Sequence, residues 1–258
     1  MHIKIFFVYA LGFVFLLSAC ERENYLVKNA VDGDTIELED GRIVRYIGLD
    51  TPETRIRRED STWLYQPEDY AEKAREFNRR LVEGKIVRLE YDMVQVDKYN
   101  RVLAYVFAGN IFVNAELIKQ GYAMLYTIPP NIKYTELFIK LQKEARENKR
   151  GLWEEVSDEP VLPEEAHNYY GRVVYVRGRV LDVYEGKSVI ILNFGKEKKD
   201  FKAVIFKTNL PIFYKYGVNP VTDYFNKKIK ISGKVKKYKK SPEIIIENPS
   251  QVEVVPCQ

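Results

Sequence analysis

The stretch VDGDTIELEDGRIVRYIGLDTPET, residues 31–54, decides the fold of the N-terminal half of the chain. Asp32-Gly33-Asp34 and Asp40-Gly41 are turn signals, and the residues between and after them favour extended structure. This pattern predicts strands at residues 35–38 and 42–49, joined by a hairpin. We therefore expect the stretch to form part of a curved sheet.

Residues on either side of this stretch predict further strands and several helices. Additional strands are expected at residues 25–31, 85–96, 102–107 and 111–113. A helix is expected from about residue 69 to 82, because apolar residues recur there at three- and four-residue spacing and Gly84 follows. Asn114 and Thr135 are expected to cap two more helices, the first ending at Gly121. The first module is thus predicted to be α+β.

The same stretch concentrates side chains suited to phosphodiester cleavage. Asp34 and Asp50 offer oxygen ligands for a hard cation, and Glu53 can orient a water molecule. Arg45, with the later Arg101, offers planar charged groups that match a phosphate. Taken singly, each of these residues is better explained as a turn residue, a solvated acid or an ordinary ion pair. Their combination predicts metal-assisted hydrolysis of a phosphodiester.

Five motifs together resemble the thermonuclease (staphylococcal nuclease-like) family over about residues 25–153. They are Asp32-Gly33-Asp34-Thr35, the segment 45–54, Asp97-Lys98-Tyr99-Asn100-Arg101, Val113-Asn114 with Gly121, and Gly151-Leu152-Trp153. They occur in the family's order and with similar spacing. The resemblance implies a five-stranded OB-fold barrel with three helices.

The resemblance also implies roles for individual residues. Arg45, Glu53 and Arg101 would be catalytic, and Asp34, Asp50 and the main-chain carbonyl of Thr51 would hold calcium (Ca²⁺). The implied enzyme is a calcium-dependent nuclease that cleaves DNA, RNA or both and leaves 3′-phosphate ends.

Residues that contact the nucleotide are expected in two places. Lys98 and Tyr99 match family positions near a terminal phosphate of the nucleotide, although an ordinary solvated loop is the alternative. Tyr126 is the one plausible counterpart of the tyrosines that surround the base in the family. Asn100 stands where the family usually has glycine, and Asn tolerates a positive φ better than most residues.

Residues 1–19 have the pattern of an export signal, with a positive charge followed by a short apolar run. Leu17-Ser18-Ala19-Cys20 resembles a bacterial lipoprotein processing site, so Cys20 is expected to carry the lipid that anchors the protein in the cell envelope. The alternative is a plain secretory peptide with an incidental cysteine. Because lipidation would consume Cys20, we expect no disulfide with Cys257.

Charge divides the rest of the chain. Residues 20–153 are expected to form the nuclease-like domain, and residues 154–167, which carry six acidic residues and no Lys or Arg, an acidic linker. Residues 168–258 contain 18 Lys or Arg against 8 Asp or Glu and are expected to form a second, basic domain. Its expected strands lie at residues 172–183, 188–194, 201–206, 228–238, 243–247 and 252–255.

This layout resembles a second, smaller OB-fold-like β-barrel, which would be all-β. Five lysines surround Tyr238 in a pattern that suits binding of single-stranded nucleic acid: Lys234, Lys236, Lys237, Lys239 and Lys240. The alternative is a solvated, lysine-rich hairpin that protects a sheet edge.

With 46% apolar and 30% charged residues, the composition excludes a disordered chain. We expect a monomeric, lipid-anchored, extracytoplasmic nuclease that acts on DNA, RNA or both. A noncatalytic nucleic-acid-binding lipoprotein and an envelope scaffold are the two alternatives of different class.

Overall fold

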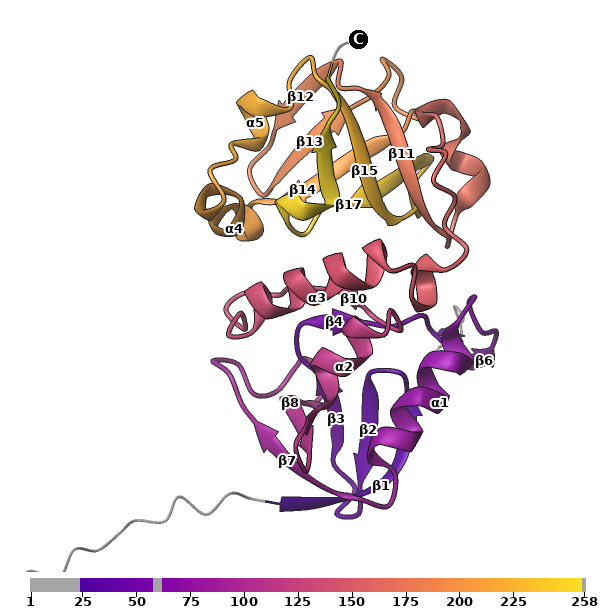
Figure 1. Cartoon of the computed structure of the whole chain (residues 1–258), viewed down its shortest axis with the longest axis vertical. Coiled ribbons are helices and arrows are strands. Elements are labelled where there is room, and N and C mark those ends of the chain that lie inside the picture. The colour runs from indigo at the N-terminus through magenta and orange to yellow at the C-terminus, as the bar shows by residue number, and fades with distance from the viewer. Residues whose placement is uncertain (1–23, 58–61, 257–258) are drawn as a thin grey trace, which may run out of the picture.

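In the computed structural model, which describes residues 24–57 and 62–256, β-structure lies on both sides of a long helix (Figure 1). One hydrophobic core gathers residues between 27 and 139, and a second gathers residues between 166 and 246. The expected signal at residues 1–19, Cys20 and Cys257 lie outside the described residues.

Five strands close the N-terminal barrel: β1 (Asn24–Asp32), β2 (Thr35–Leu38), β3 (Ile43–Tyr46), β7 (Ile86–Glu90) and β8 (Val102–Ala108). Their order is β3-β2-β1-β7-β8, and β3 also pairs with β8. The β3–β8 pair is parallel, whereas the other pairs are antiparallel. This closed mixed barrel, with helices packed on it, confirms the predicted OB-fold class.

Short strands also pair outside the five-stranded barrel. β4 (Leu49–Asp50) pairs with β10 (Met124–Leu125), and β5 (Arg55–Arg57) pairs with β6 (Trp63–Tyr65). β9 (Ile111–Phe112) continues the sheet beyond β8. The expected strand at 85–96 is shorter than predicted, because the segment after β7 leaves the sheet and Val94 bonds instead to the side chain of Asn131.

Three helices accompany the barrel: α1 (Ala71–Val82), α2 (Val113–Lys119) and α3 (Thr135–Glu147). α1 starts later than expected, because Tyr70 has a φ of 67° and cannot be helical. Asn114 and Thr135 were predicted as caps, but both lie inside their helices. Within the described residues, none of the helices combines the length and the apolar character that crossing a membrane requires.

A close contact between two glycines ties the end of α2 to the end of α3. Gly121 and Gly151 have φ values of 73° and 55°. A Cβ on Gly121 would lie 2.0 Å from the carbonyl oxygen of Arg150. Both positions therefore need glycine, for backbone conformation and for space.

The C-terminal β-module, residues 168–256, contains β11 (Val173–Arg179), β12 (Asp182–Glu185), β13 (Val189–Asn193), β14 (Lys202–Phe206), β15 (Lys228–Lys234), β16 (Lys236–Tyr238), β17 (Ser241–Ile245) and β18 (Val252–Val254). They form sheets of order β11-β15-β18 and β12-β13-β14-β17-β16, which share one core. Two short helices, α4 (Leu210–Lys215) and α5 (Pro220–Asp223), lie between β14 and β15.

The segment expected to be a linker is bonded to the C-terminal β-module. Val161 exchanges main-chain hydrogen bonds with Tyr175 and Arg177 of β11. A 3₁₀ helix, Pro163–Tyr169, follows it and buries Ala166. Shorter 3₁₀ turns occur at Gly151–Trp153, Lys207–Asn209 and Pro249–Gln251.

α3 lies against the C-terminal β-module (Figure 1). Arg146 of α3 donates to Ser232 Oγ and to the carbonyl oxygen of Ser250, both at 2.8 Å. Glu136, in the first turn of the same helix, pairs with Lys215 of α4. These polar contacts fix the two halves of the chain against each other.

Candidate active site

The turn between β1 and β2 carries the first acidic residues of the site. Asp32, Gly33 and Asp34 form this turn, and a Cβ on Gly33 would lie 2.7 Å from Thr51 Oγ1. Glycine is therefore needed for the turn to approach Thr51. The approach brings Asp34 and Thr51, which are 17 residues apart in sequence, into contact.

Asp34 is buried, with both carboxylate oxygens hydrogen-bonded. Oδ1 accepts from Thr35 Oγ1 at 2.9 Å, and Oδ2 accepts from the main-chain nitrogen and Oγ1 of Thr51, each at 3.0 Å. Only 5% of the residue is exposed. These bonds fix the carboxylate in one orientation.

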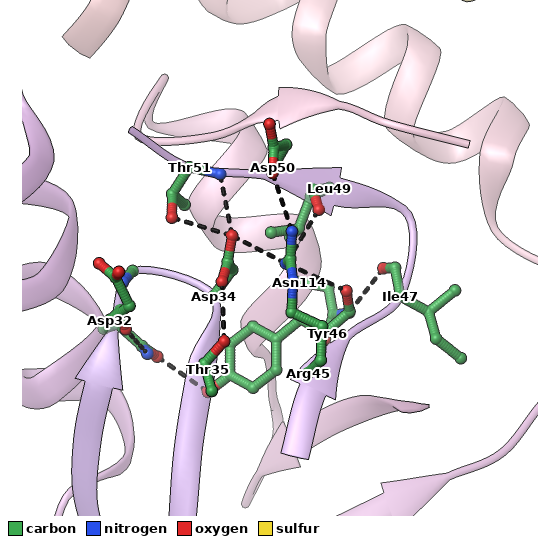
Figure 2. A network of polar contacts seen from close by, with 12 residues as sticks. Asp32, Asp34, Thr35, Arg45, Tyr46, Ile47, Leu49, Asp50, Thr51 and Asn114 are labelled. Carbon is green, nitrogen blue, oxygen red and sulfur yellow. Dashed lines mark hydrogen bonds and ion pairs between the residues drawn. The ribbon is translucent and has the colours of Figure 1, made fainter. Parts of the chain in front are cut away.

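Arg45 lies between the two predicted metal ligands (Figure 2). Its Nη1 is 2.7 Å from Asp34 Oδ2, and its Nη2 is 2.9 Å from Asp50 Oδ1. Nη1 also donates to the carbonyl oxygen of Leu49 at 3.1 Å. β3 positions Arg45 beside Thr35 of β2, and β4 presents Asp50. One guanidinium thus connects the two carboxylates.

Acidic charge exceeds basic charge around this guanidinium. Burial, together with the negative charges of Asp34, Asp32 and Asp50, raises the pKa of Glu53 to about 7. Burial and Asp34 likewise raise the pKa values of Asp32 and Asp50. Burial alone would lower the pKa of Arg45, but the surrounding carboxylates raise it. The structure therefore brings Asp34, Arg45, Asp50, Thr51 and Glu53 together.

The turn that carries Glu53 is held by Glu68, which the sequence analysis missed. The main-chain nitrogen of Glu53 donates to Glu68 Oε2 at 3.0 Å, and the main-chain nitrogen of Glu68 donates to the Glu53 carbonyl at 2.9 Å. Lys234 of the C-terminal β-module pairs with the same Glu68 oxygen at 2.5 Å. No local signal in the sequence marks this three-residue arrangement.

Two buried amide side chains, Asn114 and Asn78, form hydrogen bonds with residues next to the site. Asn114 accepts from the main-chain nitrogen of Val106 and donates to the carbonyl of Ile47, each at 2.9 Å. Asn78 donates to the carbonyl of Asp32 and accepts from the Tyr46 hydroxyl, also at 2.9 Å. The residue predicted as a helix cap, Asn114, instead fixes the turn after β3.

Arg101 lies in its own loop, which Asp97 organises. Asp97 Oδ2 accepts from Arg101 Nε at 2.8 Å, and its Oδ1 accepts from the main-chain nitrogens of Tyr99 and Arg101. Asn100 has a φ of 63°, as its replacement of glycine predicted. Within the described residues, no hydrogen bond or ion pair joins Arg101 to Asp34, Asp50 or Glu53.

The predicted nucleotide contacts are exposed. Tyr99 is 62% exposed, with the Lys98 ammonium 5.0 Å from the centre of its ring. Tyr126 follows β10, donates from its main-chain nitrogen to the carbonyl of Gly48, and shares a cavity lining with Asp50. The side chains of Lys98 and Tyr99 thus lie in the Arg101 loop, whereas Tyr126 lies beside Asp50.

The donor set fits a hard divalent cation. Asp34 and Asp50 supply carboxylate oxygens, and two further carboxylates, Asp32 and Glu53, lie close enough to Arg45 to interact with its charge. Within residues 24–57 and 62–256, no three acidic, histidine or cysteine side chains converge as a ready-made metal cluster. The fit therefore rests on two carboxylates and the Thr51 main chain.

Comparison with known proteins identifies relatives of this fold and site. The family model described as staphylococcal nuclease homologue matches residues 43–155. The chain is 43% identical over 135 residues to the thermonuclease of Staphylococcus intermedius, covering 51% of this chain and 77% of the relative. It is 39% identical over 140 residues to the thermonuclease of Staphylococcus hyicus, covering 53% and 79%.

Endonuclease YncB of Bacillus subtilis is 37% identical over 135 residues, covering 50% of this chain and 61% of the relative. The family match ends at residue 155, before the C-terminal β-module. The closed barrel, the sequence motifs and the relatives all indicate the same family. The chain therefore belongs to the staphylococcal nuclease family and is a metal-dependent nuclease, an enzyme that hydrolyses the phosphodiester bonds of nucleic acids.

Proposed function

We propose that this nuclease is calcium-dependent, cleaves DNA, RNA or both to leave 3′-phosphate ends, and acts outside the cytoplasm on a lipid anchor at Cys20. The observation that carries the catalytic part is the position of Arg45 between Asp34 and Asp50, at 2.7 and 2.9 Å. A planar guanidinium in this place can bind phosphate oxygens at the same point where the carboxylates bind a cation.

Asp34, Asp50 and the carbonyl of Thr51 would hold the cation. A bound hard cation supplies positive charge that stabilises the negative charge developing on the phosphate oxygens. Calcium suits this set because it accepts carboxylate and main-chain oxygens in flexible geometry. Asp34 is already fixed by Thr35 and Thr51, so little reorganisation is needed on its side.

Glu53 would orient the attacking water and accept its proton. Its main chain is anchored on both sides by Glu68, which fixes the turn from which the carboxylate projects. Arg45 would hold a phosphate oxygen from the β3 side. Arg101 would bind the phosphate from the Asp97 loop, which carries Lys98 and Tyr99 as contacts for a terminal phosphate.

The metal proposal is tested with a binding and an activity measurement on the same protein. We expect the parent to bind Ca²⁺ in calorimetry and to cleave DNA with Ca²⁺ but not with EDTA. Asp34→Asn and Asp50→Asn should each weaken Ca²⁺ binding, whereas Asp158→Asn, an exposed acid outside the site, should not. Unchanged Ca²⁺ affinity in both site variants would contradict the assigned ligands.

The anchor proposal rests on the sequence Leu17-Ser18-Ala19-Cys20. We expect the full chain, expressed in bacteria, to fractionate with membranes and to carry an N-terminal hydrophobic modification detected by mass spectrometry. Cys20→Ala should abolish that modification. Recovery of the unmodified parent in the soluble fraction would contradict the anchor.

A further inference from the structure

A cavity of about 190 Å³ lies where the C-terminal β-module faces the nuclease site. The wall formed by the N-terminal half of the chain includes Asp50, Thr51 and Tyr126. Two of the residues proposed to hold the cation, Asp50 and Thr51, therefore line the cavity. Its opposite wall includes Lys234 and Lys236, from β15 and β16. A surface of the second module therefore borders the catalytic centre.

The basic side chains that line this cavity all belong to the C-terminal β-module. They are Arg172, Lys234 and Lys236. Acidic lining residues lie mainly on the other side: Asp50, Asp69 and Glu155, with Glu247 from the C-terminal β-module. The cavity thus has a basic wall opposite the acidic wall that is proposed to hold the cation. The cations of the basic wall can bind a phosphate of the nucleic acid.

Lys236 is free to bind a phosphate, whereas Lys234 is not. Lys234 is already paired with Glu68. Lys236 is exposed, and within the described residues its ammonium has no hydrogen bond or ion pair. Glu243 lies opposite it in the β16–β17 register without forming an ion pair with it.

Basic side chains continue from Lys236 along the same hairpin, with Tyr238 on the hairpin and Tyr170 beside it. Lys237 lies 5.8 Å from the centre of the Tyr170 ring, and Lys239 lies 5.4 Å from the centre of the Tyr238 ring. Tyr170 and Tyr238 are 38% and 58% exposed. Alternating cations and exposed aromatic rings suit a single strand, because its phosphates need cations and its unpaired bases can stack.

We propose that this cavity is a phosphate-binding subsite for single-stranded nucleic acid, in which Lys236 holds a phosphate adjacent to the scissile one and the β16 hairpin binds the strand beyond it. The proposal rests on the proposed nuclease function. It assigns to the C-terminal β-module a direct part in substrate binding, and Lys236 acts there as a binding residue, not in the chemical step.

The first test compares substrates of two lengths with Lys236→Gln in the full chain. For a 20-nucleotide single strand, we expect KM to rise about fivefold with kcat unchanged, the effect of losing one charged phosphate contact. For a dinucleotide, which cannot reach the hairpin, KM should stay the same. The slope of log KM against log salt for the 20-mer should decrease by about 0.7.

Two control variants separate binding from general effects of charge. Lys187→Gln changes an exposed lysine between β12 and β13, away from the cavity, and should leave KM and its salt dependence unchanged. Lys236→Arg should restore the parent KM. An unchanged KM and salt slope for the 20-mer in Lys236→Gln, or an equal change in Lys187→Gln, would overturn the proposal.

Failure of the nuclease function would be recognised separately. Absence of cleavage by the parent would contradict the proposed function, and the subsite would then be judged by fluorescence anisotropy of the labelled 20-mer in EDTA. We expect the parent to bind the 20-mer in a salt-dependent manner and Lys236→Gln to bind about fivefold more weakly. Equal binding by both proteins would overturn the subsite.

Discussion

Lys234 and Glu68, 166 residues apart in sequence, form an ion pair of 2.5 Å, and the same Glu68 oxygen accepts the main-chain hydrogen bond of Glu53. The C-terminal β-module is thereby connected to the turn that carries the proposed water-orienting carboxylate. The side chain of Glu68 makes this connection, and its Oε2 atom accepts both bonds.

Removing this ion pair should affect catalysis more than stability. In Lys234→Met, the side chain of Glu68 loses its charged partner, so the carboxylate that accepts the Glu53 main-chain bond is less firmly positioned. We expect kcat to fall about tenfold, because small displacements of a reacting group are costly. The free energy of unfolding should change by less than about 1 kcal/mol, because the pair is partly exposed.

Lys230→Met is the matched control, because Lys230 lies on the same strand and also pairs with a glutamate, Glu253. Its kcat should equal that of the parent. An equal loss of kcat in both variants would show that the ion pair with Glu68 has no specific role.

Arg45→Lys tests the bridging guanidinium. Lysine keeps the charge but cannot place two nitrogens on Asp34 and Asp50 together, so a transition-state contact is lost. We expect kcat to fall by about 10² to 10³. Arg80→Lys, on the exposed face of α1, makes the same chemical change away from the site and should have no effect. Steady-state kinetics of the three proteins decide the matter, and parent-like kcat in Arg45→Lys would refute the assignment.

Arg146 should contribute to the docking of the two halves. Its guanidinium is bonded to Ser232 Oγ and the Ser250 carbonyl, and its truncation leaves both partners without these bonds. We expect Arg146→Ala to lower the free energy of unfolding by about 2 kcal/mol in chemical denaturation. Lys143→Ala, on the same helix and exposed, should cost less than about 0.5 kcal/mol. Equal values for the two variants would contradict this account.

Glu247 should make stability depend on pH. Burial raises its pKa to about 7, although Thr127 and Asn209 both donate to its Oε2. Because the folded-state pKa lies above the ordinary value of 4.5, the favourable contribution of the neutral form is complete below about pH 4.5 and is lost as pH rises to about 7.

Glu247→Gln stays neutral and can still accept both hydrogen bonds through Oε1. Its free energy of unfolding relative to the parent should therefore increase between pH 4.5 and 7, by at most about 3 kcal/mol. Denaturant titrations of both proteins across this range give the comparison. A difference that is independent of pH would show that Glu247 titrates normally.

Local sequence signals predicted the strands around residues 24–50, because turn residues and alternation act over a few positions. The Asp-Gly turns set the β1–β2 and β2–β3 pairs, and the chemistry of Asp34, Arg45 and Asp50 could be read from the same stretch. Helix caps were harder to predict. Asn114 has the side chain of a cap, yet Val106 and Ile47 offer it buried partners that stabilise the barrel instead.

Long-range contacts were not predictable from local patterns. Nothing near Glu68 indicates that it bonds to the Glu53 turn or to Lys234, since each partner is defined only when the barrel has closed and the C-terminal β-module has docked. The lysines around Tyr238 indicated affinity for nucleic acid. The position of Lys234 and Lys236 beside Asp50 appears only in the folded chain.

End-group analysis with Glu53→Gln tests the proposed site most directly. A 5′-labelled single-stranded DNA is incubated with the parent or with Glu53→Gln, in Ca²⁺ or in EDTA, and the new ends are identified. We predict 3′-phosphate and 5′-hydroxyl ends from the parent in Ca²⁺, none in EDTA, and a rate at least about 10² lower for Glu53→Gln. Cleavage that persists in EDTA, or equal rates for the two proteins, would contradict the proposed site.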